Sequence, residues 1–214
     1  MELFTIGHSN HTIESFISLL QQHGITALAD VRSHPYSRFL SHFKRQELKE
    51  ALARVGIYYV FLGKELGARP DNSECYINGK AVYEKIAATD TFGEGIQKIL
   101  QGSKKYHIAL MCAEKDPLTC HRAILVCQHL RQFDLEINHI LKNGDLESHH
   151  HLEDRMLAKH SLTKFAGAKE SPVQLSLFEP ESTDLPTREE CLAKAYILQG
   201  DEIAYVEKEQ NEHE

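Results

Sequence analysis

The sequence has no uncharged apolar stretch long enough to cross a bilayer, which argues against a membrane-spanning protein. Its first ten residues, MELFTIGHSN, place no basic residues ahead of an apolar segment, so they do not resemble a secretory signal. We therefore expect a cytoplasmic protein with no membrane partner. An odd number of cysteines, five, in a chain without an export signal argues against a disulfide framework and for free thiols or ligands.

Basic charge is scarce at the C-terminal end, where residues 170–214 carry a charge of −9. Residues 1–169 carry +2, so the overall charge of −7 comes from that end. Two basic clusters, FKRQELK and GSKKYH, are compatible with nucleic-acid binding, but solvated helix faces have the same composition. The composition allows a nucleic-acid partner without requiring one.

Short apolar runs alternate with helical patterns along most of the chain. Strands are predicted at residues 3–6, 27–31, 58–62, 107–112 and 136–141, with helices between them and a long loop at 63–80. This alternation predicts an α/β domain over residues 1–165, with a mostly parallel sheet of about five strands and flanking helices. Ligands of such sheets bind outside the carboxyl ends of the strands. Arginine, histidine, serine and cysteine side chains follow several of these strands, which makes this edge the predicted site.

The stretch MCAEKDPLTCHRAIL, residues 111–125, combines several reactive side chains. As a metal site, it would supply Cys112, Cys120 and His121, with His8 as a fourth ligand. Its spacing differs from a C-x-x-C pair, and adjacent Cys120 and His121 at a helix start are expected to point in different directions. We therefore predict no cofactor, with zinc as the less favoured alternative.

Two other interpretations of this stretch are compatible with each other. A helix predicted over residues 121–133 would place Cys120 at its N-terminus, where the dipole and the neighbouring Arg122 lower a thiol pKa. The same N–H groups would hold a phosphate together with Arg122 and Arg32. Cys112 and Cys127 fit better as small buried apolar residues. The candidate catalytic residues are Cys120, His121, Glu114 and His8, and the candidate phosphate-binding residues are Arg32, Arg38, Arg122, Ser9 and Ser37.

Four motifs, TIGHSNHT, ADVRSHPYSRF, FLGKELGARP and CAEKDPLTCHR, resemble in order and spacing the family of domains of unknown function numbered 488. The resemblance spans roughly residues 2–142 and implies an α/β fold without supplying a reaction. The positions that match the family motifs are Gly7, His8, Ser9, Asp30, Arg32, Pro35, Ser37, Arg38, Gly63, Gly67, Cys112, Glu114, Cys120, His121 and Arg122.

Beyond residue 165, a segment rich in proline, serine and acid predicts a disordered linker over residues 166–186. It contains QLSLF, Gln174, Leu175, Ser176, Leu177 and Phe178, which resembles the peptide by which bacterial polymerases and repair proteins bind the DNA sliding clamp. The alternative is that this apolar island packs on the domain. A small helix is predicted over residues 187–206 and a disordered end over 207–214.

The leading hypothesis is a DNA- or nucleotide-processing protein recruited to DNA by this peptide, with the sliding clamp and DNA as partners. If it is an enzyme, a hydrolase or transferase acting on a phosphoester or glycosidic bond fits the residues. Two alternatives remain: an enzyme acting on a phosphorylated metabolite, and a non-catalytic module that binds anions or nucleic acid. The histidines at 149–151 are expected to form a solvated helix start.

Overall fold

A computed structural model describes residues 1–36, 40–167 and 185–207 of the chain. The predictions for Ser37, Arg38 and the peptide from Gln174 to Phe178 lie outside these residues. No helix in the described ranges is both long enough and apolar enough to cross a bilayer.

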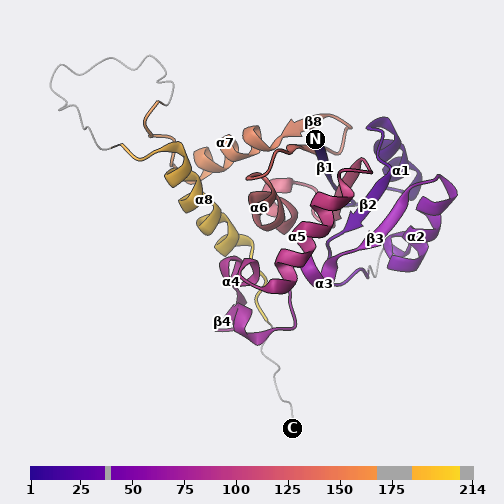
Figure 1. The fold of residues 1–214 in the computed structure, drawn as a ribbon, viewed down its shortest axis with the longest axis horizontal. Coiled ribbons are helices and arrows are strands. Elements are labelled where there is room, and N and C mark those ends of the chain that lie inside the picture. The colour runs from indigo at the N-terminus through magenta and orange to yellow at the C-terminus, as the bar shows by residue number, and fades with distance from the viewer. Residues whose placement is uncertain (37–39, 168–184, 208–214) are drawn as a thin grey trace, which may run out of the picture.

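Within the described residues, one six-stranded sheet has the strand order β3-β2-β6-β1-β7-β8 (Figure 1). Its strands are β1 (Glu2–Gly7), β2 (Ala27–Asp30), β3 (Tyr58–Phe61), β6 (Ile108–Cys112), β7 (Glu136–Ile140) and β8 (Leu146–Ser148). The first five are parallel and β8 pairs antiparallel with β7. The predicted α/β class and mostly parallel sheet are therefore confirmed. The sequence analysis missed β8 because three residues are too few to show a period.

Helices cover both faces of the sheet, as the layers in Figure 1 show. One face packs against α1 (Ile13–Gln22) and α2 (Arg45–Arg54). The opposite face packs against α3 (Gly63–Leu66), α4 (Tyr83–Ala87), α5 (Asp90–Gly102), a π-helix (Arg122–Cys127) that continues into α6 (Gln128–Leu130), α7 (His149–Lys159) and α8 (Arg188–Ile203). This second face is the larger core.

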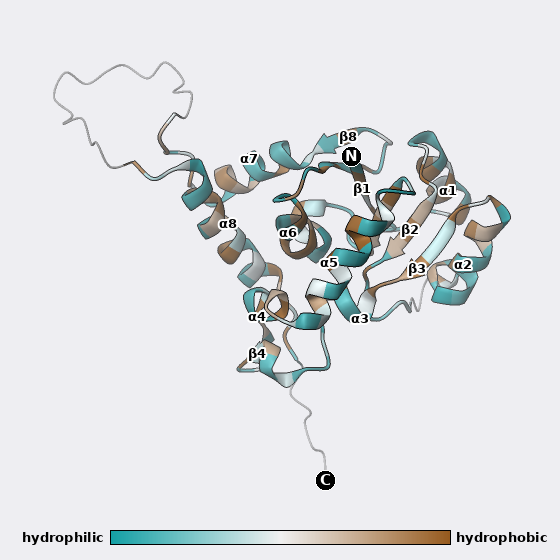
Figure 2. Cartoon of the chain, viewed as in Figure 1, coloured by the Kyte–Doolittle hydropathy of each residue, from teal (hydrophilic) through white to brown (hydrophobic). Residues whose placement is uncertain are grey.

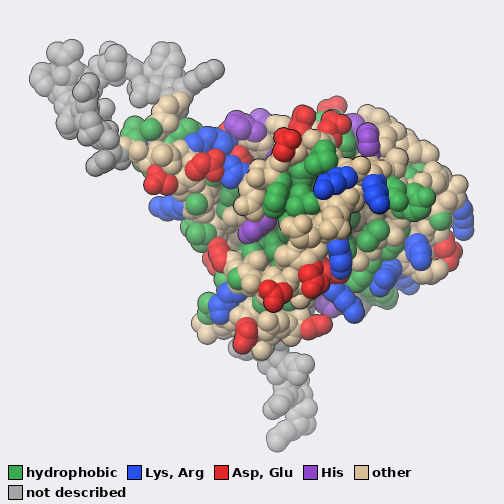
Figure 3. All heavy atoms as spheres, viewed as in Figure 1, with side chains coloured by type: hydrophobic (Ala, Val, Ile, Leu, Met, Phe, Trp, Pro, Cys, Tyr) green, Lys and Arg blue, Asp and Glu red, His purple; other side chains and the backbone are tan. Residues whose placement is uncertain are grey.

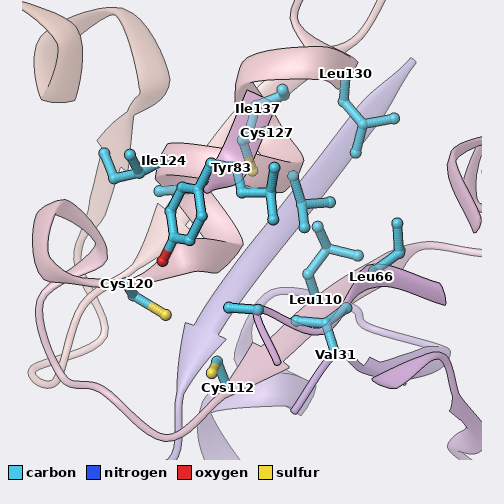
Figure 4. Close-up of a cluster of buried hydrophobic side chains, with 14 of the residues drawn as sticks. Val31, Leu66, Tyr83, Leu110, Cys112, Cys120, Ile124, Cys127, Leu130 and Ile137 are labelled. Atoms are coloured by element: carbon cyan, nitrogen blue, oxygen red, sulfur yellow. The ribbon is translucent and has the colours of Figure 1, made fainter. Parts of the chain in front are cut away.

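The period of two along β6 decides which face each of its side chains meets. Ile108, Leu110 and Cys112 join the larger core, whereas Ala109 and Met111 join the core under α1 and α2. Cys112 therefore ends the strand beneath the π-helix. Figure 4 shows Cys112 and Cys120 together at one end of this cluster of apolar side chains.

The segment predicted as a loop at residues 63–80 contains short elements. Besides α3, it holds a 3-10 turn (Ser73–Cys75) and the strand β4 (Tyr76–Ile77), which pairs with β5 (Lys80–Ala81). These elements are only two to four residues long, so no hydrophobic period marks them in the sequence.

The C-terminal helix α8 packs on the domain through one apolar side, and its alternating bands of hydropathy are visible in Figure 2. Its start is fixed by a capping box between Thr187 and Glu190. After the helix, the chain returns to the β4–β5 hairpin, where the Ala81 N–H donates to the carbonyl of Tyr205 over 2.9 Å. At the other end, the Ala166 N–H donates to the carbonyl of Pro186, also over 2.9 Å. The residues flanking the QLSLF segment are thus held side by side.

Candidate functional site

A cleft of about 370 Å³ lies where the carboxyl ends of β1, β2 and β6 meet, which is the edge that the sequence predicted. Polar and aromatic side chains from six separate parts of the chain line it. The lining residues are His8, Arg32, Ser33, His34, Tyr36, Ala68, Arg69, Tyr83, Cys112, Ala113, Glu114, Thr119, His121, Ile203 and Tyr205.

Gly7 allows the loop after β6 to approach the end of β1. A Cβ at this position would lie 1.9 Å from the Glu114 carbonyl oxygen, so any other residue would push the loop away. The His8 N–H donates to the carbonyl of Cys112 over 2.9 Å, and the Ser9 N–H donates to that of Ala113 over 2.8 Å. These bonds extend the β1–β6 pairing into the loop. The glycine of the GHS motif is therefore a packing requirement of the site.

Arg32 and His8 line the cleft next to each other, and Asp30 fixes the position of Arg32. The Arg32 guanidinium donates to both carboxylate oxygens of Asp30, over 2.9 and 2.6 Å, and the Tyr59 hydroxyl donates to the same carboxylate over 2.7 Å. The remaining Arg32 nitrogen, NH1, lies 3.3 Å from His8 Nε2. Burial and the charge of Arg32 lower the pKa of His8 to about 4. At neutral pH His8 is therefore uncharged and can accept a hydrogen bond.

Three further lining residues, Cys112, Glu114 and His121, gather with the buried Cys120, and we call these four side chains the thiol cluster. One ligand-type atom from each of them lies within 4.8 Å of the others. The sulfur atoms of Cys112 and Cys120 are 3.0 and 3.1 Å from the same carboxylate oxygen, Glu114 Oε2. His121 Nδ1 is 3.6 Å from the Cys112 sulfur, and its other nitrogen, Nε2, lies 3.0 Å from the carbonyl of Val31.

The expectation that adjacent Cys120 and His121 point in different directions is wrong. Cys120 has an extended backbone (φ −133°, ψ 135°), whereas His121 is already helical (φ −59°, ψ −25°). This change of backbone conformation between neighbours turns both side chains toward Cys112. The spacing of the residues could not show it, because the sequence does not give the conformation of the residue before a helix.

Protons are shared unevenly in the thiol cluster. Burial alone would raise the pKa of Cys120. Its hydrogen bond with Cys112 and the charges of Arg122 and His121 lower the pKa by more than burial raises it, so the pKa lies below the usual value of a thiol. Burial, together with the charge on Cys120, raises the pKa of both Cys112 and Glu114. For His121, burial lowers the pKa, but contact with the Cys120 thiolate outweighs it and the pKa is raised. Cys120 is thus the thiol that ionises first.

Arg122 is fully buried beneath the thiol cluster and does not line the cleft. Its guanidinium donates to the carbonyls of Glu114 and Lys115, over 2.8 and 3.4 Å, and to the Thr5 hydroxyl over 3.3 Å. It therefore holds the loop that carries Glu114. Phosphate binding by Arg122 stays a prediction that this geometry does not favour.

The structure brings His8, Arg32, Glu114 and His121 to the cleft, with Cys120 buried directly behind it. Ser9 does not line it, and its hydroxyl donates to Asn10. Sequence reasoning missed Arg69, Tyr83 and Tyr205, which also line the cleft. Arg69 is part of the FLGKELGARP motif, so its membership of that motif was an available signal. No such signal exists for Tyr205, because only the return of the chain after α8 brings it here.

A second polar cluster lies deeper under the same sheet face, and we call it the histidine chain: Thr5, His139, His149, Tyr196 and Glu153. Thr5 Oγ1 is 2.7 Å from His139 Nδ1, His139 Nε2 is 3.0 Å from His149 Nδ1, and His149 Nε2 is 2.9 Å from the Tyr196 hydroxyl. That hydroxyl donates to Glu153 over 3.0 Å. The expectation of a solvated start for 149–151 is wrong at His149, which is 6% exposed, because it faces the core from the first turn of α7.

A larger, shallower cleft of about 1210 Å³ lies beyond the loop at 115–117, between that loop and residues 141–148. Its main charged groups neutralise each other, since Arg155 pairs with both Glu147 and Asp116 over 2.8 Å. It contains no thiol and is separated from Arg32 and His8. We therefore place the candidate site in the smaller cleft.

Comparison with known proteins gives a family and no function. The model of a family described as a domain of unknown function, DUF488, matches residues 12–128, which is more than half of the chain. Searches of curated proteins and of solved structures returned no match. The matched range includes Arg32, Arg69 and the whole thiol cluster. The chain therefore belongs to the DUF488 family.

Proposed function

We propose that the cleft binds the phosphate of a nucleotide or a DNA strand and that the chain processes this ligand. The observation that supports it is the pair of arginines, Arg32 and Arg69, that face one polar cleft at the carboxyl edge of a parallel sheet. Guanidinium groups match phosphate oxygens in geometry and charge, and arginine keeps its charge at any physiological pH. His34, which is exposed on the same rim, adds a further donor.

Aromatic side chains favour a nucleotide over other phosphorylated ligands. Tyr36 is 67% exposed and lines the cleft together with Tyr205. The guanidinium of Arg69 lies over the Tyr205 ring, 4.2 Å from its centre, which holds this arginine against an aromatic surface. Stacking on such surfaces is the usual way in which proteins bind unpaired bases. A single-stranded or extruded nucleotide fits this arrangement better than duplex DNA does.

The proposed chemistry is hydrolysis or transfer at a phosphoester or glycosidic bond. Glu114 is the acidic residue among the side chains that line the cleft, which neutral His8 also lines. We assign proton transfer to this pair and to His121, because all three reach the cleft. Cys120 lies behind them as the candidate nucleophile.

Recruitment to DNA is assigned to the QLSLF peptide by its sequence. The peptide lies between α7 and α8 in the sequence, and the described residues Ala166 and Pro186 on either side of it are hydrogen-bonded to each other. A tether of this kind raises the local concentration of the domain at clamp-bearing DNA.

The phosphate proposal is tested by fluorescence anisotropy of a labelled single-stranded oligonucleotide bound to the full-length protein. Arg69→Ala is expected to weaken binding about tenfold and to lower the salt dependence by about one ion. The matched control is Arg54→Ala, an exposed arginine at the end of α2 away from the cleft, which should leave binding unchanged. Equal effects of both variants would refute cleft binding.

A phosphorylated metabolite is the second candidate, because a cleft of about 370 Å³ is the size of a small-molecule site. Competition in the same anisotropy assay tests whether small phosphorylated ligands use the site of the oligonucleotide. If they do, inorganic phosphate and mononucleotides should displace the oligonucleotide. A protein that binds mononucleotides and shows no oligonucleotide binding would favour the metabolite.

Clamp recruitment is tested separately, by surface plasmon resonance with a purified bacterial sliding clamp. Binding should be lost in a Leu177→Ala/Phe178→Ala variant and kept in Leu185→Ala, an exposed leucine outside the motif. Absence of binding by the unmodified protein would remove the recruitment proposal and leave the cleft proposal standing.

A further inference from the structure

The thiol cluster has the donor composition of a metal site: two sulfurs, an imidazole nitrogen and a carboxylate oxygen. Three of its members are almost completely buried, with Cys112 3%, Cys120 1% and His121 9% exposed. Both sulfurs point at a single carboxylate oxygen, at 3.0 and 3.1 Å, which brings three potential metal ligands to one place. A cation between the four atoms would give each of them a separate interaction.

The orientation of His121 fits a metal ligand. Its Nε2–H donates to the carbonyl of Val31 over 3.0 Å, which leaves Nδ1 as the nitrogen directed at the thiols. Metal-binding histidines are typically held in this way, with the second ring nitrogen donating to a carbonyl or a carboxylate. The bond fixes the ring plane before any ligand binds.

We propose that Cys112, Cys120 and His121 bind one Zn²⁺ ion, with Glu114 in the fourth position at the cleft. In a tetrahedral zinc site, bond lengths of about 2.3 Å to sulfur and 2.0–2.1 Å to nitrogen separate these two atoms by about 3.5–3.6 Å. The Cys112 sulfur and His121 Nδ1 are 3.6 Å apart. Sulfur-to-oxygen separations in such a site are about 3.5 Å, so the Glu114 carboxylate must move outward by about half an ångström. It can do so because it borders the cleft.

The surrounding charges are compatible with this ion. Two thiolates and one carboxylate carry three negative charges, and zinc supplies two positive ones. The buried guanidinium of Arg122, which holds the Glu114 and Lys115 carbonyls, supplies the third. Cysteine and histidine ligands favour zinc over magnesium or calcium, which prefer oxygen.

Four protein ligands make a closed site, whereas catalytic zinc sites keep one position open to water or substrate. Glu114 is the ligand that borders the cleft, so chemistry at the ion would require this carboxylate to leave the fourth position. Its use in catalysis rests on the proposed function, whereas binding of the ion does not. A zinc-bound Cys120 is not a free nucleophile, so the same experiment decides between the two roles of this residue.

The test uses untagged full-length protein, purified under reducing conditions without chelator. Elemental analysis is expected to find about one zinc per chain. After zinc is removed and Co²⁺ is added, a sulfur-to-cobalt charge-transfer band in the near ultraviolet should appear and should be abolished by one equivalent of Zn²⁺. Exposed histidines such as His150 and His151 cannot produce this band, because they contain no sulfur.

Cys120→Ala should remove the stoichiometric zinc, and the matched control Cys191→Ala, a buried cysteine of α8 outside the cluster, should retain it. If Cys120→Ala does not fold, the cobalt spectrum of the unmodified protein still decides. A zinc content near zero with no charge-transfer band overturns the proposal, as does a band that survives in Cys120→Ala. Oligonucleotide binding measured on the same sample reports on the proposed function independently.

Discussion

The thiol cluster and the histidine chain are both polar groups beneath the same face of the sheet, yet they are connected differently. In the histidine chain the hydrogen bonds run in one series from Thr5 to Glu153, and the charge of Glu153 is met by ion pairs with Arg131 and Arg188 at 2.6 and 3.1 Å. Figure 3 shows acidic and basic side chains adjoining at that end of the molecule, near α8. In the thiol cluster, one carboxylate oxygen serves two sulfurs and the group borders a cleft.

This difference separates two purposes of buried polarity. A network whose hydrogen bonds run in series and whose charge is met by arginines stabilises the packing of the elements that supply it, here β1, β7, α7 and α8. A group in which four atoms with lone pairs converge beside a cleft is better suited to bind something else. Burial of charge and histidine is therefore a weak guide to function, and the convergence of lone-pair atoms at a cleft is a better one.

The largest effect is expected at the charged end of the histidine chain. Glu153 is 3% exposed and bonds with Arg131, Arg188 and the Tyr196 hydroxyl, so Glu153→Ala should lower the free energy of unfolding by about 3 kcal/mol. Glu189→Ala is the matched control, because Glu189 pairs with the same Arg131 but is 65% exposed, and it should cost under about 1 kcal/mol. Urea unfolding measures the free energy of unfolding of both variants. Equal losses would show that the burial of Glu153 adds nothing to the strength of its ion pairs.

Gly7→Ala should cost about 2–3 kcal/mol, because the new Cβ would lie 1.9 Å from the Glu114 carbonyl and would displace the loop of the thiol cluster. Gly93→Ala in α5 is the control, since a Cβ there meets no atom within 4 Å. That substitution should stabilise the protein by about 0.5–1 kcal/mol through helix propensity. Thermal unfolding that moves in the same direction for both variants would contradict the close approach at Gly7.

Acid should weaken the fold through the histidine chain. Burial and the charge of Arg131 lower the pKa of His149 from 6.5 to about 3. Above pH 6.5 the residue is neutral in both states; below it, the unfolded chain binds a proton that the folded chain does not, so stability falls continuously down to about pH 3. At pH 5 the loss from this residue is about 2 kcal/mol.

Urea unfolding at pH 7 and pH 5 checks this expectation. His149→Gln should be less stable at pH 7 but should lose less stability on acidification, whereas His150→Gln, an exposed neighbour, should behave like the unmodified protein. The same acid-induced loss in His149→Gln and in the unmodified protein would mean that other groups cause it.

The sequence predicts well what depends on hydrophobic periods and on the alternation of strands and helices. This alternation located the parallel sheet and its carboxyl edge, and the structure places His8, Arg32, Glu114 and His121 at that edge. What it missed depends on backbone conformation at single residues or on contacts between distant segments. Cys120 and His121 point the same way because of the backbone conformation of single residues. Tyr205 lines the cleft because a distant segment of the chain, after α8, packs there.

The smallest effect on stability is expected at Glu114. Glu114→Gln keeps a side-chain oxygen that can accept hydrogen bonds from the thiols, and the side chain borders the cleft. The free energy of unfolding should therefore change by under about 1 kcal/mol. Because an amide is a poorer zinc ligand than a carboxylate, Co²⁺ and Zn²⁺ binding should weaken about tenfold in the same variant. A functional loss without a stability loss is the opposite of what Glu153→Ala should show. If Glu114→Gln instead destabilised the fold as much as Glu153→Ala, both clusters would serve packing, and the distinction drawn between them would fail.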